Sequence, residues 1–459
     1  MALITSISGI RGTIGGRPGE NLTPVDVVNF AAAYGSLLQQ YGRSDTIVIG
    51  RDARPSGEMV QQLVMQTLAG MGFTLIDLGL STTPTVEMAV PLADAAGGII
   101  LTASHNPVQW NALKVLNAEG EFISRAEGER LLEGIRKQNF VFQLVENLGH
   151  IEDGGNYLDQ HIQAILGLEL VDVEAIRQQA FKIAVDPVNS SGAIAVPALL
   201  EQLGCETVLI NGTPNGQFAH NPEPLPAHLT ELCDTVNDQG AQLGIAVDPD
   251  VDRLAFVQED GVFFGEEYTL VAAADYVLSR QSGDAVSNLS SSRALRDIAR
   301  RHGGRYYASA VGEVNVVEKM KEVHAVIGGE GNGGVILPDL HYGRDALVGI
   351  ALVLSHLATS GQTLSELRRS YPSYEMVKDK IALDPGLDLD GLLDELENAF
   401  SGAQLDRTDG LKADFEHGWL HLRKSNTEPI IRVYAEAASA DEARGLVQRA
   451  KEQVQQTLA

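Results

Sequence analysis

The sequence predicts an α/β protein in which three similar α/β domains, with mixed, mainly parallel sheets, precede a smaller C-terminal α+β domain. Over about the first 370 residues, short β-branched runs alternate with amphipathic segments of helix length, which is the pattern of βαβ units. The chain has 459 residues, too many for one compact core. We therefore expect four domains around a central cleft.

The predicted elements recur as three matched sets. In each set a strand leads through a polar turn into a helix, and these first strands cover residues 46–50, 182–185 and 285–287. The second strands cover residues 72–78, 205–210 and 304–308. A third strand then ends in a polar loop, and the loops read TASHNP, DPDVDR and GGEGNGG. Three sets in the same order favour related domains, which we place at residues 1–150, 151–255 and 256–370.

The last part of the chain, residues 371–459, has a different pattern. A helix is predicted at 389–400, followed by strands at 410–415, 419–423 and 430–437. Ser439 and Glu442 form a capping box for a final amphipathic helix that ends near Leu458. This order predicts the small α+β domain.

Composition excludes several classes of protein. The chain has 34 basic and 61 acidic residues, a net charge of −27, which repels nucleic acids and anionic membranes. No stretch approaches the roughly 18 apolar residues of a membrane span, and the N-terminus lacks the pattern of a signal peptide. Cys205 and Cys233 have no partners spaced for a disulfide framework or a zinc finger. We expect a cytoplasmic protein whose scarce basic residues gather around an anionic ligand.

The first polar loop follows an apolar strand that stops at Thr102 and Ala103. It places Ser104 and His105 at the strand end, where a hydroxyl has room for in-line attack. Ser104 is therefore a candidate nucleophile or phosphoryl carrier. Serine is also a common turn residue, so a simple turn hydroxyl is the alternative.

The second polar loop carries three carboxylates at alternate positions, Asp248, Asp250 and Asp252, with Arg253 adjacent. In a strongly curved turn all three can face one hard cation, and Mg²⁺ prefers oxygen ligands. A solvated acidic turn is the alternative, although like charges packed after a buried strand need a cation or an Arg to offset them.

The remaining loops offer polar groups for a phosphorylated ligand. Glu330 and Asn332 stand among glycines in IGGEGNGGV and suit sugar hydroxyls, unless this is only a flexible turn. The C-terminal turn is a plausible phosphate clamp, with the donor residues Arg423, Lys424, Ser425, Asn426, Thr427 and Arg432. An ordinary hairpin is the alternative there. Arg11 and Lys114 could reach the same ligand, or could form surface salt bridges.

Together these loops resemble the motifs of the α-D-phosphohexomutase superfamily, enzymes that move phosphate between the 1- and 6-positions of hexoses. The similar segments are TASHNP at 102–107 (phosphoserine loop), DPDVDR at 248–253 (metal loop), GEGNG at 329–333 (sugar loop) and RKSNTEP at 423–429 (phosphate loop). They occur in the family's order, and the resemblance spans nearly the whole chain. It implies the same four-domain architecture.

The resemblance also implies roles for the candidate residues. Ser104 would carry the phosphoryl group, and Mg²⁺ would lie between this phosphate and Asp248, Asp250 and Asp252. Arg11 and Arg253 would contact phosphate, while His105 and Lys114 match acid–base positions. Substrate would be held by Gly312, Glu330, Asn332, Arg423, Ser425, Asn426, Thr427 and Arg432.

The activity implied is that of a phosphoglucosamine mutase working through a hexose 1,6-bisphosphate, with phosphomannomutase or phosphoglucomutase activity as the alternative. The partners would be small hexose phosphates, and the chain a monomer or homodimer. The sequence departs from the family at Gly333-Gly334, where many members have a His, and at Pro249, where Gly is common. A haloacid-dehalogenase-like phosphatase with Asp248 as nucleophile, and a sugar-phosphate-binding relative without turnover, are the rival hypotheses.

Overall fold

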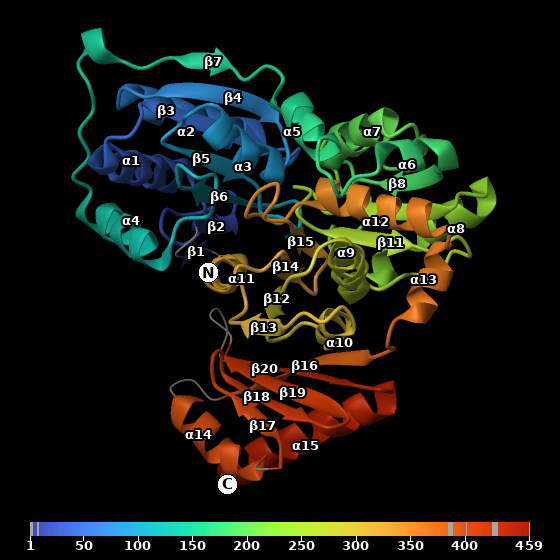
Figure 1. The fold of residues 1–459 in the computed structure, drawn as a ribbon. Helices are drawn as coiled ribbons and strands as arrows, with labels where there is room; N and C mark the ends of the chain where they lie inside the picture. The colour runs from blue at the N-terminus through green and yellow to red at the C-terminus, as the bar shows by residue number, and fades with distance from the viewer. Residues whose placement is uncertain (1–2, 7–8, 384–388, 401, 425–429, 459) are drawn as a thin grey trace. The chain divides into compact units, whose positions relative to one another are not determined.

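The computed structural model describes residues 3–6, 9–383, 389–400, 402–424 and 430–458 (Figure 1). The chain forms two compact units. The first comprises Met1–Tyr276 and Asn332–Leu367, and the second comprises Val277–Gly331 and Arg368–Ala459.

A seven-stranded mixed sheet organises the N-terminal part of the first unit, in the order β1-β2-β6-β5-β3-β4-β7. Its strands are β1 (Leu3–Ser6), β2 (Gly9–Thr13), β3 (Thr46–Arg51), β4 (Thr74–Leu80), β5 (Gly97–Leu101), β6 (Trp110–Leu116) and β7 (Ile151–Asp153). The central strands β5, β3 and β4 are parallel, whereas β2 and β6 pair antiparallel with their neighbours. The run Gly-Gly-Ile-Ile-Leu of β5 is buried along its whole length, as expected of a strand covered on both faces.

Helices cover both faces of this sheet because apolar residues point alternately to its two sides. Ile47 and Ile49 of β3 pack with residues of α1 (Pro24–Tyr41), α2 (Gly57–Gly70) and α4 (Arg125–Lys137). Val48 belongs to a separate core with residues of α3 (Thr83–Leu92). Helix α3 begins where the hydroxyl of Thr82 accepts a hydrogen bond from the backbone of Thr85.

A four-stranded sheet in the order β11-β10-β8-β9 follows in the same unit. Its strands are β8 (Lys182–Asp186), β9 (Glu206–Leu209), β10 (Leu243–Val247) and β11 (Leu254–Val257). The first three are parallel and β11 is antiparallel. The unit also contains η1 (Val145–Asn147), α5 (Tyr157–Leu166), α6 (Val173–Gln179), α7 (Gly192–Gln202), η2 (Pro226–His228), α8 (Thr230–Gln239), β15 (Gly334–Ile336) and α12 (Ala346–Ser360).

The second unit combines a parallel sheet with an antiparallel one. The parallel strands are β12 (Ala285–Asn288), β13 (Tyr306–Ser309) and β14 (Ile327–Glu330), accompanied by α10 (Ala294–Arg301) and α11 (Glu313–Val323). The antiparallel sheet contains β16 (Glu375–Ala382), β17 (Gln404–Asp406), β18 (Leu411–Phe415), β19 (Gly418–Lys424) and β20 (Ile430–Ala437). Its helices α14 (Leu389–Ala399) and α15 (Ala440–Leu458) lie on one face (Figure 1). Helices α9 (Glu266–Arg280) and α13 (Leu364–Ser370) belong partly to each unit.

The predicted fold class, three α/β domains and a smaller α+β domain, is confirmed. The strands of the three sets are present, although the one expected at 72–78 is β4, Thr74–Leu80. Strand β16 was not predicted, because its charged residues hide the apolar alternation of EMVKDKIA. Among the residues that the structure describes, no single helix is long and apolar enough to span a membrane, although α12 and α13 together reach that length and composition.

Candidate active site

The loop that carries Ser104, residues 102–110, begins where β5 ends and is called the serine loop below. Ser104 adopts a left-handed backbone conformation, φ 47°, which is uncommon for a residue with a side chain. Its backbone N–H donates to Oγ1 of Thr102 (2.9 Å), and its hydroxyl donates to Oδ2 of Asp248 (2.6 Å). The residue is 7% exposed. The loop thus holds the serine hydroxyl against the acidic loop that follows β10.

Arg54 holds this loop in place from the polar turn after β3. Its guanidinium is buried and forms an ion pair with Asp52 (2.9 Å). The remaining donors reach backbone carbonyls of the serine loop, those of Ser104, Asn106, Pro107 and Trp110. A planar guanidinium with five donors suits such a cluster of carbonyls. The one sequence signal for this role is a basic residue in the first polar turn, RDARPSGEM.

The acidic loop brings three carboxylates together. Asp248, Asp250 and Asp252 have no exposed surface, and their ligand oxygens lie within 4.8 Å of one another. Val251 between them has φ 64°, which marks the strong curvature of the loop. The carbonyl of Pro249 accepts hydrogen bonds from the hydroxyls of Ser190 and Ser191 (2.8 and 2.7 Å), so the turn after β8 supports this loop.

The charges of the acidic loop are offset by cations from other parts of the unit. Nζ of Lys114, on β6, donates to Oδ2 of Asp250 (2.8 Å) and lies 3.6 Å from Oδ2 of Asp252. Burial alone lowers the pKa of Lys114, but these two carboxylates raise it overall, so the ammonium stays charged. Burial raises the pKa of Asp250, but Lys114 outweighs it and holds the carboxyl ionised. Burial and the other two carboxylates raise the pKa of Asp248 well above its usual range.

Two further residues complete the surroundings of the acidic loop and were not predicted. Arg344 donates to Oδ2 of Asp252 (2.7 Å), and the hydroxyl of Thr83, at the start of α3, donates to Oδ2 of Asp250 (2.8 Å). Both lie far from the loop in the sequence, and neither belongs to a recognisable motif.

The three aspartates suit a divalent cation. Oδ1 of Asp250 and Oδ1 of Asp252 are buried and, within the described part of the chain, have no hydrogen-bond partner. Buried oxygens of this kind are costly unless something pairs with them. Carboxylate oxygens are the ligands that Mg²⁺ prefers. The residues present therefore fit a magnesium ion next to the Ser104 hydroxyl.

Basic side chains border the serine on the same unit. Nη1 of Arg11, on β2, donates to Oδ1 of Asn106 (3.0 Å), and Nη1 of Arg253 donates to Oε1 of Glu223 (3.3 Å). Nδ1 of His105 lies 3.5 Å from Oγ of Ser104. Burial, with the charges of Arg253 and Arg11, lowers the pKa of His105 to about 2, so its imidazole is neutral.

The other predicted substrate residues lie mainly on the second unit. Glu330 ends β14, is buried, and accepts hydrogen bonds from Nδ2 of Asn288 (2.8 Å) and from the backbone of Gly312 (3.1 Å). Arg423 is the second-last residue of β19, pairs with Asp409 (2.8 Å), and lies opposite Arg432 of β20. Asn332 belongs to the first unit. Ser425, Asn426 and Thr427 lie outside the described residues.

The structure thus brings part of the predicted site together. The residues that meet on the first unit are Ser104, His105, Arg11, Lys114, Arg253, Asp248, Asp250 and Asp252. Gly312 meets Glu330, and Arg423 meets Arg432, on the second unit. The roles assigned to these residues stay predictions.

Comparison with known protein families assigns the chain to one family. Four models of one family match almost its whole length, and they describe phosphoglucomutase/phosphomannomutase α/β/α domain I (residues 3–142), domain II (157–261), domain III (265–374) and C-terminal domain (378–453). The chain belongs to the phosphoglucomutase/phosphomannomutase family. It is therefore an enzyme of the mutase type, an isomerase.

Individual members of this family are similar over nearly their full length. A phosphoglucomutase/phosphomannomutase of Thermococcus kodakarensis is 35% identical over 94% of this chain and 95% of its own. A phosphoglucosamine/phosphogalactosamine mutase of Sulfurisphaera tokodaii is 30% identical over 99% of this chain and 100% of its own. The crystal structure of a phosphoglucomutase/phosphomannomutase family protein from Burkholderia thailandensis is 25% identical, with a TM-score of 0.85 over 99% of this chain and 98% of that one.

The structure explains one departure of this phosphohexomutase from the expected family pattern. A Cβ added at Gly333, where φ is 90°, would lie 2.2 Å from the carbonyl oxygen of Leu254. A Cβ added at Gly334 would lie 2.4 Å from Cδ of Arg344. Arg344 thus occupies the space that a side chain at position 334 would need, and a histidine cannot be placed there without displacing it.

Proposed function

We propose that this phosphohexomutase interconverts glucosamine 6-phosphate and glucosamine 1-phosphate, with Ser104 as the phosphoryl carrier and a hexose 1,6-bisphosphate as the bound intermediate. The observation that carries the proposal is the 2.6 Å hydrogen bond from Oγ of Ser104 to Asp248 within a buried triad of aspartates. A serine next to a cation site and two arginines has the surroundings that a phosphoserine needs.

Each transfer exchanges one P–O bond for another. The bond from phosphorus to Oγ of Ser104 breaks and a bond from phosphorus to the free sugar hydroxyl forms. The proton of that hydroxyl passes to a base, and Oγ of Ser104 takes up a proton as it leaves. Nδ1 of His105 lies 3.5 Å from Oγ of Ser104, so this imidazole can accept the proton once the phosphate dianion beside it raises its lowered pKa. After the bisphosphate has turned over, the reverse exchange returns the other phosphoryl group to Ser104.

The residues around Ser104 offset the charge of the transferred group. Mg²⁺ held by Asp248, Asp250 and Asp252 would supply a Lewis acid for the phosphoryl oxygens. Arg11 and Arg253 would donate to the same oxygens. Lys114, held by Asp250 and Asp252, keeps the triad from carrying three uncompensated charges.

The second unit would recognise the rest of the substrate. Glu330 is a buried carboxylate that can pair with the ammonium group of glucosamine. Arg423 and Arg432, paired across β19 and β20, would hold the phosphate that is not transferred. Glucose or mannose phosphate is the second candidate substrate, favoured by the similarity to the Thermococcus kodakarensis phosphoglucomutase/phosphomannomutase.

Competition monitored by ³¹P NMR tests the substrate. The protein is given Mg²⁺, a trace of hexose 1,6-bisphosphate and equal amounts of glucosamine, mannose and glucose 6-phosphates. Glucosamine 1-phosphate should form fastest, and Glu330→Gln should slow it more than it slows glucose 1-phosphate. Faster conversion of mannose or glucose phosphate would overturn the glucosamine assignment, and equal losses in the variant would overturn the role of Glu330.

Ser104→Ala tests the phosphoryl carrier. We expect turnover to fall by at least about 10³-fold, because the group that accepts phosphate is gone. Acid-stable phosphate should be trapped on Ser104 of the unaltered protein. Acid-labile phosphate on Asp248 would instead indicate a phosphatase, and full turnover by the alanine variant would refute the mechanism.

A further inference from the structure

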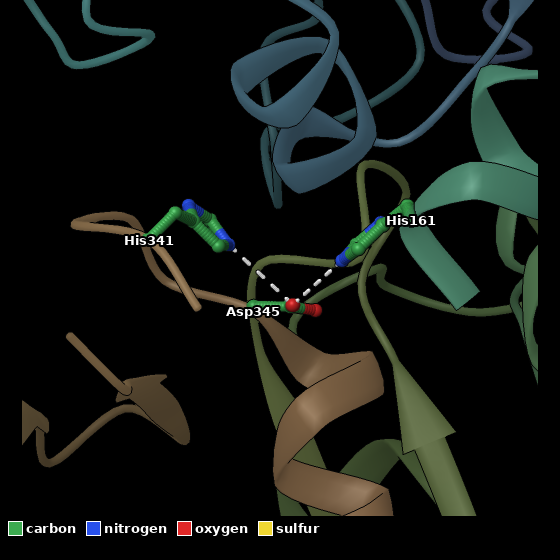
Figure 2. Close-up of side chains that lie close together, drawn as sticks. All are labelled: His161, His341 and Asp345. Carbon is green, nitrogen blue, oxygen red and sulfur yellow. Dashed lines mark hydrogen bonds and ion pairs between the residues drawn. The ribbon is translucent and has the colours of Figure 1, made fainter. Parts of the chain in front are cut away.

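A second group of ligand-type side chains lies in the first unit and takes no part in the chemistry above. It consists of His161 on α5, His341 in the loop before α12, and Asp345, the N-cap residue of α12 (Figure 2). The side chains converge from segments that are far apart in the sequence. The side chains of His161 and Asp345 have no exposed surface, and that of His341 is 12% exposed.

The distances within this group match those of a metal site. Oδ2 of Asp345 lies 2.9 Å from Nε2 of His161 and 3.5 Å from Nε2 of His341. The ligand atoms all lie within 4.8 Å of one another. Zinc binds His nitrogen and carboxylate oxygen at about 2.0–2.2 Å with tetrahedral angles, which separates neighbouring ligand atoms by roughly 3.3 Å. The two observed separations lie on either side of this value, and the shorter one, between His161 and Asp345, is also a hydrogen bond.

The outer nitrogen of each imidazole faces an oxygen. Nδ1 of His161 lies 3.1 Å from Oγ1 of Thr85, and Nδ1 of His341 lies 3.5 Å from Oε2 of Glu87. Metal-bound histidines usually donate their second N–H to such a partner, which fixes the tautomer that leaves the other nitrogen for the metal. Thr85 and Glu87 both belong to α3.

Hydrogen bonding alone leaves this group incomplete. Nε2 of His341 is buried and has no hydrogen-bond partner within the described residues. Asp345 is a buried carboxylate beside two imidazoles, which supply a counter-charge only when they are protonated. A divalent cation would balance the charge of Asp345 and would bind Nε2 of His341. Gly343 permits this approach, because a Cβ there would lie 1.9 Å from Oε2 of Glu87.

We propose that His161, His341 and Asp345 bind a zinc ion, with a water molecule as the fourth ligand. Two imidazole nitrogens and one carboxylate suit zinc and do not suit magnesium, which prefers oxygen ligands. The ion would join α5 to the loop before α12 and, through Thr85 and Glu87, to α3. Asp345 follows Arg344, which pairs with Asp252, so the ion would also fix the position of that arginine.

Zinc content of the untagged full-length chain tests the proposal. The protein is equilibrated with zinc in a large excess of Mg²⁺, which occupies the aspartate triad, and is then freed of loose metal. We expect about one zinc per chain, lost in His161→Ala, His341→Ala and Asp345→Asn. His220→Ala is the matched control, because His220 pairs with Asp186 at 3.0 Å but belongs to no group of three ligands in the described part of the chain. Absence of zinc from the unaltered protein would overturn the proposal, as would loss from the control variant alone.

Cobalt substitution keeps the proposal testable if the alanine variants do not fold. Co²⁺ in a four-coordinate site with two histidines gives intense visible absorption, whereas Co²⁺ on the oxygen ligands of the triad gives weak absorption. His341→Cys should retain the metal and add a thiolate-to-cobalt charge-transfer band. Weak absorption in the unaltered protein, or a cysteine variant without the new band, would show that these residues do not hold the metal.

Discussion

Arg54 and Arg293 occupy corresponding places in the first and third copies of the repeat of strand, turn and helix. Their side chains hold different parts of the molecule. Each lies in the polar turn between the first strand and the following helix. Arg54 donates to the backbone of the loop that carries Ser104. Arg293 donates to Asp414 and to the carbonyls around the turn between β18 and β19, those of Phe415, Glu416 and Gly418.

The difference shows how the same repeat can position a polar loop in one copy and anchor the C-terminal sheet in another. The first strand of each copy neighbours the third, so the turn after the first strand lies beside the loop after the third. In the second copy Ser190 and Ser191 use this proximity to hold Pro249, and in the third copy Ser291 accepts a hydrogen bond from the backbone of Gly331 (3.0 Å). Because Ser291 holds the loop after β14 in the third copy, Arg293 is not needed there and contacts the C-terminal sheet instead.

Arg54→Met should have the largest effect on turnover and stability of the variants proposed in this section. We expect about 10²-fold lower kcat, because the serine loop loses its fixed geometry. Stability should fall by about 3–5 kcal/mol, because Asp52 becomes a buried charge without its partner. Turnover and denaturant unfolding check both effects. Asp52→Asn with Arg54→Met should regain part of the stability but not the turnover. Recovery of full turnover would contradict the role of Arg54 in holding the serine loop.

Acid should lower the stability of the antiparallel sheet that Arg293 contacts. Burial lowers the pKa of His421, whose Nδ1 lies 2.9 Å from Oγ of Ser290, from its ordinary 6.5 to about 4. Between these values the unfolded chain binds a proton and the folded chain does not. The free energy of unfolding should therefore fall by up to about 3 kcal/mol as pH drops from 6.5 to 4. Unfolding at several pH values checks this, and His421→Gln should flatten the profile over that window.

A smaller effect is expected from Arg293→Met. Its partner Asp414 is partly exposed, so water can replace some of the lost interaction, and we expect a loss of about 1–3 kcal/mol. Hydrogen exchange should accelerate in β18 and β19, while the amides of residues 102–110 keep their protection. Faster exchange in the serine loop as well would show that the two arginines do not act separately.

The smallest effect should come from the serines of the second copy. Ser190→Ala and Ser191→Ala should each cost about 0.5–1 kcal/mol, because the other hydroxyl still donates to Pro249. The double variant should lose more than the sum, because the buried carbonyl then has no donor from this pair. Thermal unfolding checks the difference, and simple additivity would show that the two bonds are independent.

The sequence contained enough to predict the fold class and the meeting of Ser104 with the three aspartates. Both loops follow apolar strands, and ligands bind beyond the carboxyl ends of parallel strands. Because β5 and β10 belong to different sheets, however, the meeting of the two loops was predicted from the family resemblance and not from sheet geometry. The repeat of strand, turn and helix could be predicted because it depends on residues that are close together in the chain.

The supports of the site could not be predicted in this way. Arg344 and Thr83 contact the acidic loop from segments about 90 and 170 positions away, and a lone Arg or Thr carries no pattern that names its partner. The same is true of His161 and His341, whose meeting depends on how α5 packs against the loop before α12. Pairings of this kind are set by tertiary packing alone.

The division of the chain into two units has a consequence for any attempt to dissect the protein. The backbone passes between the units after Tyr276, after Gly331 and after Leu367. The third repeat is therefore shared, with its parallel strands β12 to β14 in one unit and α12 in the other. A gene fragment cut at the ends of the third repeat would contain parts of both units and the whole of neither, so we expect the fragment not to fold by itself.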